Sequence, residues 1–188
     1  MGGHILLRTF WRYRFGPEAA KEDPGIQAIL TGMDRVVLMA PDGLKGEEGP
    51  MLAFRSRSLI RKFGPLMSAD MFRDNSRNVY FDPATCPPIV GELTFASFQY
   101  QHGYAALADI TMDTLGAQPL DGQLGAFKLP ILLLWGKDDK VLRFRHSAVF
   151  ATELPQVKFC ALEQCGHALQ TDLADQVARL TLDFAHIP

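Results

Sequence analysis

An unbroken apolar run that stops at a glycine and an acid is the feature that most limits how this chain can fold. Residues 129–139 read LPILLLWGKDD, in which Ile131–Trp135 are apolar at every position and Gly136 ends the run. Such a run is typical of a parallel strand covered on both faces. Asp139 follows the turn, and functional side chains gather at the carboxyl ends of parallel strands. The run therefore predicts a buried strand with a carboxylate at its functional end.

A second strand-like run carries a histidine to the same place. Val157–Leu162 leads into Cys165-Gly166-His167, where the glycine predicts a tight turn. Two neighbouring parallel strands deliver the residues that follow them to one sheet edge. We therefore expect Asp139 and His167 to lie close together.

Strand and helix signals alternate around these two motifs. Arg35–Ala40 is a third apolar run, closed by a Pro-Asp-Gly turn signal, and we expect this strand also to be covered on both faces. Helical spacing of apolar residues occurs at Arg145–Glu153 and at Leu173–Phe184. This alternation predicts an α/β fold, with a parallel sheet, flanking helices and right-handed crossovers.

Residues 44–118 have a different character and no convincing strand run. Helical patterns occur in Ile89–Tyr100 and Tyr104–Leu115, and Pro and Gly break the rest. We interpret 44–118 as a helical lid inserted between two core segments, 1–43 and 119–188.

The bulk composition excludes several kinds of partner. The 188 residues are 47% hydrophobic and carry a net charge of −2, so there is no electrostatic case for a nucleic acid or membrane partner. No apolar run approaches the ~20 residues that span a bilayer. Three cysteines without a Cys-x-x-Cys motif predict reduced thiols and a cytoplasmic location. The histidines lack metal-ligand spacing, so we expect neither a metal nor a cofactor.

Taken together, these motifs resemble the α/β-hydrolase superfamily. Residues 129–139 are similar to the penultimate strand and acid turn of that family, and 165–168 to its histidine loop. The segment 36–43, VVLMAPDG, looks like the strand that precedes the family's lid. In the family pattern the acid stands four residues after the Trp, which selects Asp139 over Asp138. The resemblance implies that Asp139 orients His167 and that His167 acts as the base.

The first residues resemble half of another family motif. Met1-Gly2-Gly3 is similar to the part of the Gly-x-Ser-x-Gly nucleophile elbow that follows the serine. This alignment implies that Met1 supplies an oxyanion-hole amide, that Gly2 allows close backbone approach, and that the nucleophile precedes Met1. We therefore expect a partial α/β-hydrolase fold without its first strands, catalytically inactive or nearly so.

Other residues compete for these roles. Some members of the superfamily place the acid where Asp42 stands, although a Pro-Asp-Gly turn residue is the simpler interpretation. No serine in the chain lies in a glycine-flanked elbow, so none replaces the missing nucleophile. Cys165 lies only two residues from His167, which is poor geometry for proton transfer, so we interpret it as a packed thiol.

The resemblance implies hydrolysis of an ester, another acyl bond or a carbon–carbon bond in a small apolar substrate, through a covalent intermediate. An aspartate-nucleophile epoxide hydrolase or dehalogenase is one alternative. A non-catalytic binding or assembly module is another. In such a module the strand at Arg35–Ala40 would have an unpaired edge, which predicts aggregation, self-association or pairing with a separate N-terminal half.

Overall fold

The computed structural model describes residues 6–7, 9, 24–45, 57–116 and 119–185. Met1 and Gly2, and with them the predicted elbow, lie outside these ranges. The described residues Leu6, Leu7 and Thr9 are helical, and Leu7 is buried in the main core. None of the helices in the described ranges is long and apolar enough to cross a membrane.

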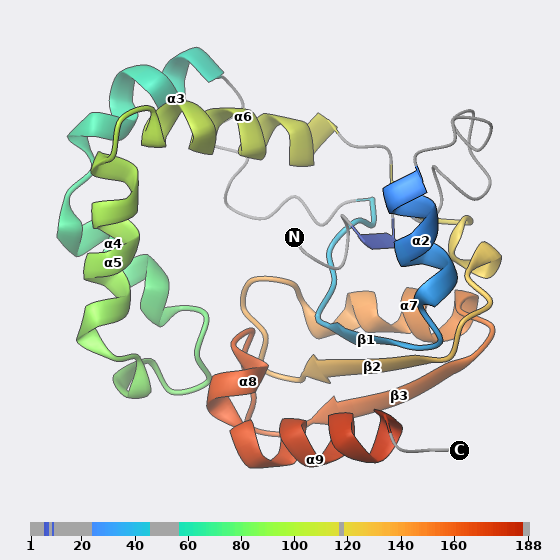
Figure 1. Cartoon of the computed structure of the whole chain (residues 1–188). Coiled ribbons are helices and arrows are strands. Elements are labelled where there is room, and N and C mark those ends of the chain that lie inside the picture. The colour runs from blue at the N-terminus through green and yellow to red at the C-terminus, as the bar shows by residue number, and fades with distance from the viewer. Residues whose placement is uncertain (1–5, 8, 10–23, 46–56, 117–118, 186–188) are drawn as a thin grey trace.

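Three parallel strands form one sheet in the order β1-β2-β3 (Figure 1). β1 is Val36–Met39, β2 is Ile131–Gly136 and β3 is Val157–Leu162. These are the three apolar runs of the sequence, so the predicted parallel α/β architecture is confirmed. The carboxyl ends of β2 and β3 lie side by side, because Gly136 is in register with Leu162.

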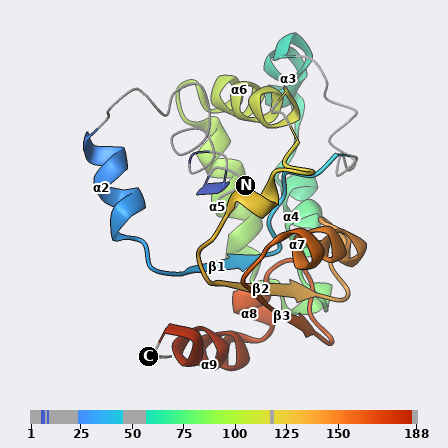
Figure 2. The ribbon, with the colours of Figure 1, turned by 90° about the vertical axis from the view of Figure 1, so that its right-hand side faces the viewer.

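Helices cover this sheet on both sides. Between β2 and β3 the chain forms α7 (Ser147–Glu153), and after β3 it forms α8 (Leu169–Asp172) and α9 (Ala174–Ala185). Figures 1 and 2 show α7 and α9 on opposite faces of the sheet. The predicted Leu173–Phe184 helix corresponds to α9, in which Val177 and Phe184 are buried in the core.

The three strands differ in burial, and the expectation that β1 is covered on both faces was wrong. All six residues of β2 are buried, whereas Met39 in β1 is 38% exposed and Val36 and Val37 are only partly buried. β2 lies between two strands, but β1 pairs only with β2 in the described part of the chain. An apolar run shows that a segment suits a buried strand, but it does not show how many other strands pair with that segment.

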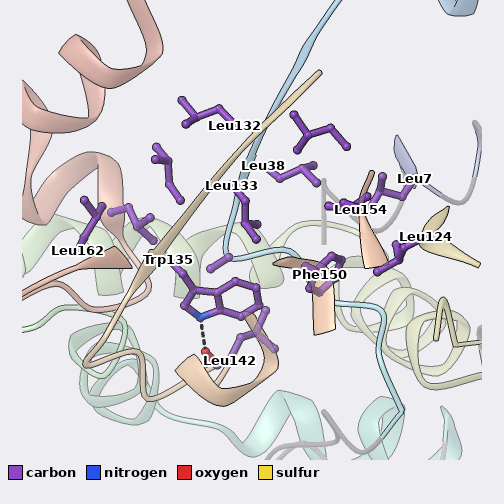
Figure 3. Close-up of a cluster of buried hydrophobic side chains, with 14 of the residues drawn as sticks. Leu7, Leu38, Leu124, Leu132, Leu133, Trp135, Leu142, Phe150, Leu154 and Leu162 are labelled. Atoms are coloured by element: carbon purple, nitrogen blue, oxygen red, sulfur yellow. Dashed lines mark hydrogen bonds between the residues drawn. The ribbon is translucent and has the colours of Figure 1, made fainter. Parts of the chain in front are cut away.

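The core is built around the end of β2 (Figure 3). Trp135 packs against Phe150 of α7, with ring centroids 5.9 Å apart, and both side chains are fully buried. Leu132 and Leu133 of β2 and Leu38 of β1 belong to the same cluster. Each side chain of this size stabilises the fold by about 1.5–3 kcal/mol through burial. The strand that leads to the acid is therefore buried along its whole length.

Between β1 and β2 the chain forms the helical segment, which we define as residues 57–116. Its helices are α3 (Arg57–Phe63), α4 (Ala69–Arg77), α5 (Pro88–Gln99) and α6 (Gly103–Gly116), and its described residues contain no strand. α4 and α5 lie on the side toward which β2 and β3 point (Figure 1). Whether the segment acts as a lid with bounds 44–118 stays a prediction.

An aromatic stack holds α4, α5 and α6 together. Phe72 contacts both Phe95 and Phe98, and Phe98 stacks on Tyr104 with ring centroids 5.8 Å apart. Gly91 allows the close approach of α5 to α4, since a Cβ there would lie 2.5 Å from the Cα of Arg73. These aromatic residues therefore pack against one another inside the helical segment.

The remaining elements are short connections. In the described ranges these are α2 (Pro24–Gly32), which precedes β1, and the 3₁₀ turns η2 (Gly64–Leu66), η3 (Pro83–Thr85), η4 (Leu124–Ala126) and η5 (Phe144–His146).

Candidate active site

The turn after β2 places Asp139 in a fully enclosed position. The Asp139 side chain has 0% exposure. Its Oδ1 accepts hydrogen bonds from the backbone N–H groups of Val141 and Leu142, both at 2.8 Å. A buried carboxylate needs such donors, because its charge is costly away from water. Two amides hold one oxygen and leave Oδ2 for another partner.

That partner is the ring of His167. The distance from His167 Nδ1 to Asp139 Oδ2 is 2.8 Å, and the His167 side chain is 29% exposed. A carboxylate oxygen only accepts, so Nδ1 carries the proton and donates it. In the neutral ring Nε2 then carries no proton and can accept one. The pair therefore has the acid-and-base arrangement that general base catalysis requires.

The acid turn, which follows β2, is in close backbone contact with the histidine loop, residues 164–168. A Cβ on Gly136 would lie 2.3 Å from the carbonyl oxygens of both Cys165 and Gly166. The N–H of Asp138 donates to the Cys165 carbonyl at 3.0 Å. Only a glycine allows this approach, so Gly136 has a second role besides ending the strand.

The other side of the histidine loop lies against the helical segment. The N–H groups of His167 and Ala168 both donate to the carbonyl of Val79, at 2.8 and 2.9 Å. The N–H of Gly166 donates to Asp172 Oδ2 at 2.7 Å, and the same oxygen accepts the N–H of Phe81 at 3.0 Å. Reading the sequence missed Val79, Phe81 and Asp172. No motif marks them, because two are used through their backbones and the third is one acid among many.

The competing residues are placed elsewhere. The side chain of Asp138 is exposed, and Asp139, not Asp42, holds His167 Nδ1. The hydroxyls of Ser76 and Ser97 donate to helix carbonyls, and Ser68 caps α4. Met1 and Gly2 lie outside the described residues, so their predicted oxyanion and elbow roles stay predictions.

Cys165 is a packed thiol. The residue is fully buried, and burial raises the pKa of its thiol to about 12, with further contributions from the charges of Asp172, Asp139 and Asp138. A nucleophilic cysteine needs the thiolate, which this environment disfavours. Within the described ranges, no group of three or more acidic, cysteine or histidine residues could hold a metal ion.

Curated relatives are similar over most of this chain. A 2-hydroxy-6-oxo-6-phenylhexa-2,4-dienoate hydrolase of Burkholderia cepacia is 25% identical over 152 residues, covering 80% of this chain and 53% of its own. A 2-hydroxy-6-oxononadienedioate/2-hydroxy-6-oxononatrienedioate hydrolase of Comamonas testosteroni is 24% identical over the same shares. The chain thus spans about half the length of these relatives. No family model matches the chain.

Solved structures show the same fold. The 2-hydroxy-6-oxo-6-phenylhexa-2,4-dienoate hydrolase of Rhodococcus sp. strain RHA1 superposes with a TM-score of 0.68 at 16% identity, over 98% of this chain and 73% of its own. A meta-cleavage product hydrolase of Pseudomonas fluorescens superposes with a TM-score of 0.64 at 17% identity, over 86% of this chain and 60% of its own.

Proposed function

Because this chain belongs to the α/β-hydrolase superfamily, we propose that Asp139 and His167 are the acid and base of a hydrolase that cleaves a carbon–carbon bond. The observation that carries the proposal is the 2.8 Å hydrogen bond between His167 Nδ1 and the enclosed Asp139. The relatives are hydrolases, which supports the reaction class.

The pair would act through the second ring nitrogen. His167 Nε2 accepts the proton of a nucleophile while that nucleophile forms a bond to the substrate carbonyl carbon. Asp139 stabilises the imidazolium that results. The imidazolium then returns the proton to the leaving carbon as the carbon–carbon bond breaks, and Nε2 next accepts a proton from the water that hydrolyses the covalent intermediate.

The nucleophile belongs to the same proposal. None of the six serines lies between glycines in an elbow motif. Met1-Gly2-Gly3 resembles the part of a Gly-x-Ser-x-Gly elbow that follows the serine, which supports a serine nucleophile in the intact hydrolase. In a hydrolase of this kind, the loss of the nucleophile lowers kcat by as much as ~10⁶.

The substrate class follows from the relatives. Their names describe 2-hydroxy-6-oxo dienoates, small molecules with a carboxylate and an apolar or acidic end group. We propose a substrate of this type. The helical segment lies between β1 and β2, where our interpretation of the sequence places a lid. It would cover the bound substrate.

The test compares two adjacent carboxylates. The protein encoded by the source DNA, with any codons upstream of Met1, is assayed for hydrolysis of 2-hydroxy-6-oxo-6-phenylhexa-2,4-dienoate. Asp139→Asn should lower kcat about 10³–10⁴-fold, because the Asn amide can donate to Nδ1 and thus favours the wrong tautomer. Asp138→Asn is the matched control, since its side chain is exposed in the same turn, and should keep the wild-type rate.

Equal rates in the two variants, or no turnover of any 2-hydroxy-6-oxo dienoate, would overturn the proposal. Fluorophosphonate labelling tests the nucleophile separately. A labelled residue directly before Met1 supports serine chemistry. A substrate-derived ester on an aspartate at that position would support the epoxide-hydrolase or dehalogenase alternative instead.

A further inference from the structure

One side chain joins the histidine loop to the helical segment. Asp172 ends α8, and its Oδ2 accepts the N–H of Gly166 at 2.7 Å and the N–H of Phe81 at 3.0 Å. Gly166 directly precedes the candidate base, and Phe81 follows α4. A single carboxylate oxygen therefore bridges two backbone segments that are far apart in the sequence.

The two segments are in close backbone contact around this bridge. A Cβ on Gly166 would lie 2.7 Å from the nitrogen of Phe81 and 2.8 Å from the carbonyl oxygen of Val79. That Val79 oxygen accepts the next two N–H groups of the loop, those of His167 and Ala168. Three consecutive amides are thus satisfied, and Asp172 is the only one of their acceptors that is a side chain.

The loop has little freedom left on its opposite side. The acid turn contacts the carbonyl groups of Cys165 and Gly166, and Asp138 donates to the first of them. His167 is the next residue of the loop, and its ring nitrogen Nδ1 lies 2.8 Å from Asp139 Oδ2. A small displacement of the loop away from Val79 would therefore change the position of the ring relative to the carboxylate.

We propose that Asp172 is a positioning residue for His167, holding the histidine loop against Val79–Phe81 so that the ring stays on Asp139. This inference rests on the proposed role of His167 as the base. It also makes the helical segment part of the machinery that orients the base. Asp172 also acts on Tyr80, which lies between Val79 and Phe81. Burial raises the pKa of the Tyr80 hydroxyl, and Cys86 and the charge of Asp172 raise it further.

The test is an NMR measurement that does not need turnover. In the full chain, the downfield Nδ1 proton of His167 reports the bond to Asp139, and hydrogen exchange reports the amides of Gly166 and Phe81. Asp172→Ala should broaden or abolish the Nδ1 signal and accelerate both amides by about tenfold or more. Asp172→Asn keeps an acceptor oxygen, so the Nδ1 signal should be retained.

Two controls separate positioning from general damage. The amides of Leu132–Leu134 in β2 should exchange at the wild-type rate in every variant. Asp175→Ala removes an exposed acid from the first turn of α9 and should change neither signal. An unchanged Nδ1 signal in folded Asp172→Ala would overturn the proposal.

If Asp172→Ala does not fold, Asp172→Asn decides. A neutral oxygen accepts a weaker hydrogen bond than a carboxylate, so exchange at Gly166 and Phe81 should be several-fold faster than in the wild type, and unchanged exchange contradicts the proposal. If Asp172→Ala loses the Nδ1 signal of His167 but the wild-type protein cleaves no dienoate, the proposed function is refuted and the positioning role of Asp172 is supported. If the ring stays on Asp139 in Asp172→Ala while Asp139→Asn loses activity, the positioning role of Asp172 is refuted and the proposed function is supported.

Discussion

The indole nitrogen of Trp135 donates a hydrogen bond to the carbonyl of Leu142 at 2.9 Å (Figure 3). The N–H of the same Leu142 donates to Asp139 Oδ1. One residue of the turn is therefore held at both of its backbone groups, by the last large side chain of the strand and by the acid itself. The apolar strand thus fixes the conformation of the turn that presents the carboxylate.

The first prediction concerns this bond. Trp135→Phe removes the donor and leaves the buried Leu142 carbonyl without it, which costs about 1–3 kcal/mol, and the smaller ring adds roughly 1 kcal/mol of lost packing. Urea unfolding should show a total loss of about 2–4 kcal/mol. Phe63→Leu, at a ring that is 45% exposed, should change the free energy of unfolding by no more than about 0.5 kcal/mol. Equal losses in both variants would contradict this role of the indole.

The second prediction concerns the close backbone contact of the histidine loop. Gly166→Ala places a methyl group 2.7 Å from the Phe81 nitrogen, and backbone atoms cannot move aside as a side chain would. The free energy of unfolding should fall by about 1–3 kcal/mol or more.

Gly32→Ala is the matched control for Gly166→Ala. A Cβ at Gly32 meets nothing within 4 Å, so the change should be neutral or stabilising by up to about 1 kcal/mol. The same denaturation curves measure both variants. A stable Gly166→Ala protein would show that the loop and residues 79–81 are not held as closely as described.

The third prediction concerns thiol reactivity. Since the pKa of Cys165 is raised to about 12, its thiolate makes up only about one part in 10⁴ at pH 8. Iodoacetamide at pH 8 should therefore modify the partly buried Cys160 first and leave Cys165 intact until the protein unfolds. Peptide mass spectrometry identifies the modified residue. Alkylation of folded Cys165 at the rate of Cys160 would refute the prediction.

The fourth prediction is a pH dependence at His146. Burial lowers the pKa of His146 below its usual 6.5, and Arg145 and Arg143 lower it further, while Asp121 acts in the opposite sense. The unfolded chain then binds more protons than the folded chain below about pH 6.5, so stability falls as the pH falls through this range. His146→Gln removes this contribution.

Urea midpoints at pH 7.5 and pH 5 measure the His146 effect. The wild type should lose more stability between these two pH values than His146→Gln does. The same loss in both proteins would show that His146 does not contribute to the acid sensitivity.

Much of the sheet could be predicted from residue chemistry alone. The runs at Arg35–Ala40, Ile131–Trp135 and Val157–Leu162 are β1, β2 and β3 to within one residue at each end, because a buried parallel strand needs apolar side chains at nearly every position. The exposure of Met39 could not be predicted, because it depends on which strand lies in the middle of the sheet.

The sequence by itself determined the strands and the two residues, Asp139 and His167, that their turns deliver to one sheet edge. A strand run and its turn are local patterns, and they can be read over a few residues. Only the tertiary structure decided what holds the histidine in place, since the Val79 carbonyl, the Phe81 amide and Asp172 meet the loop through contacts between distant segments. Any residue has a backbone carbonyl and amide to offer, so no side-chain pattern could have marked them.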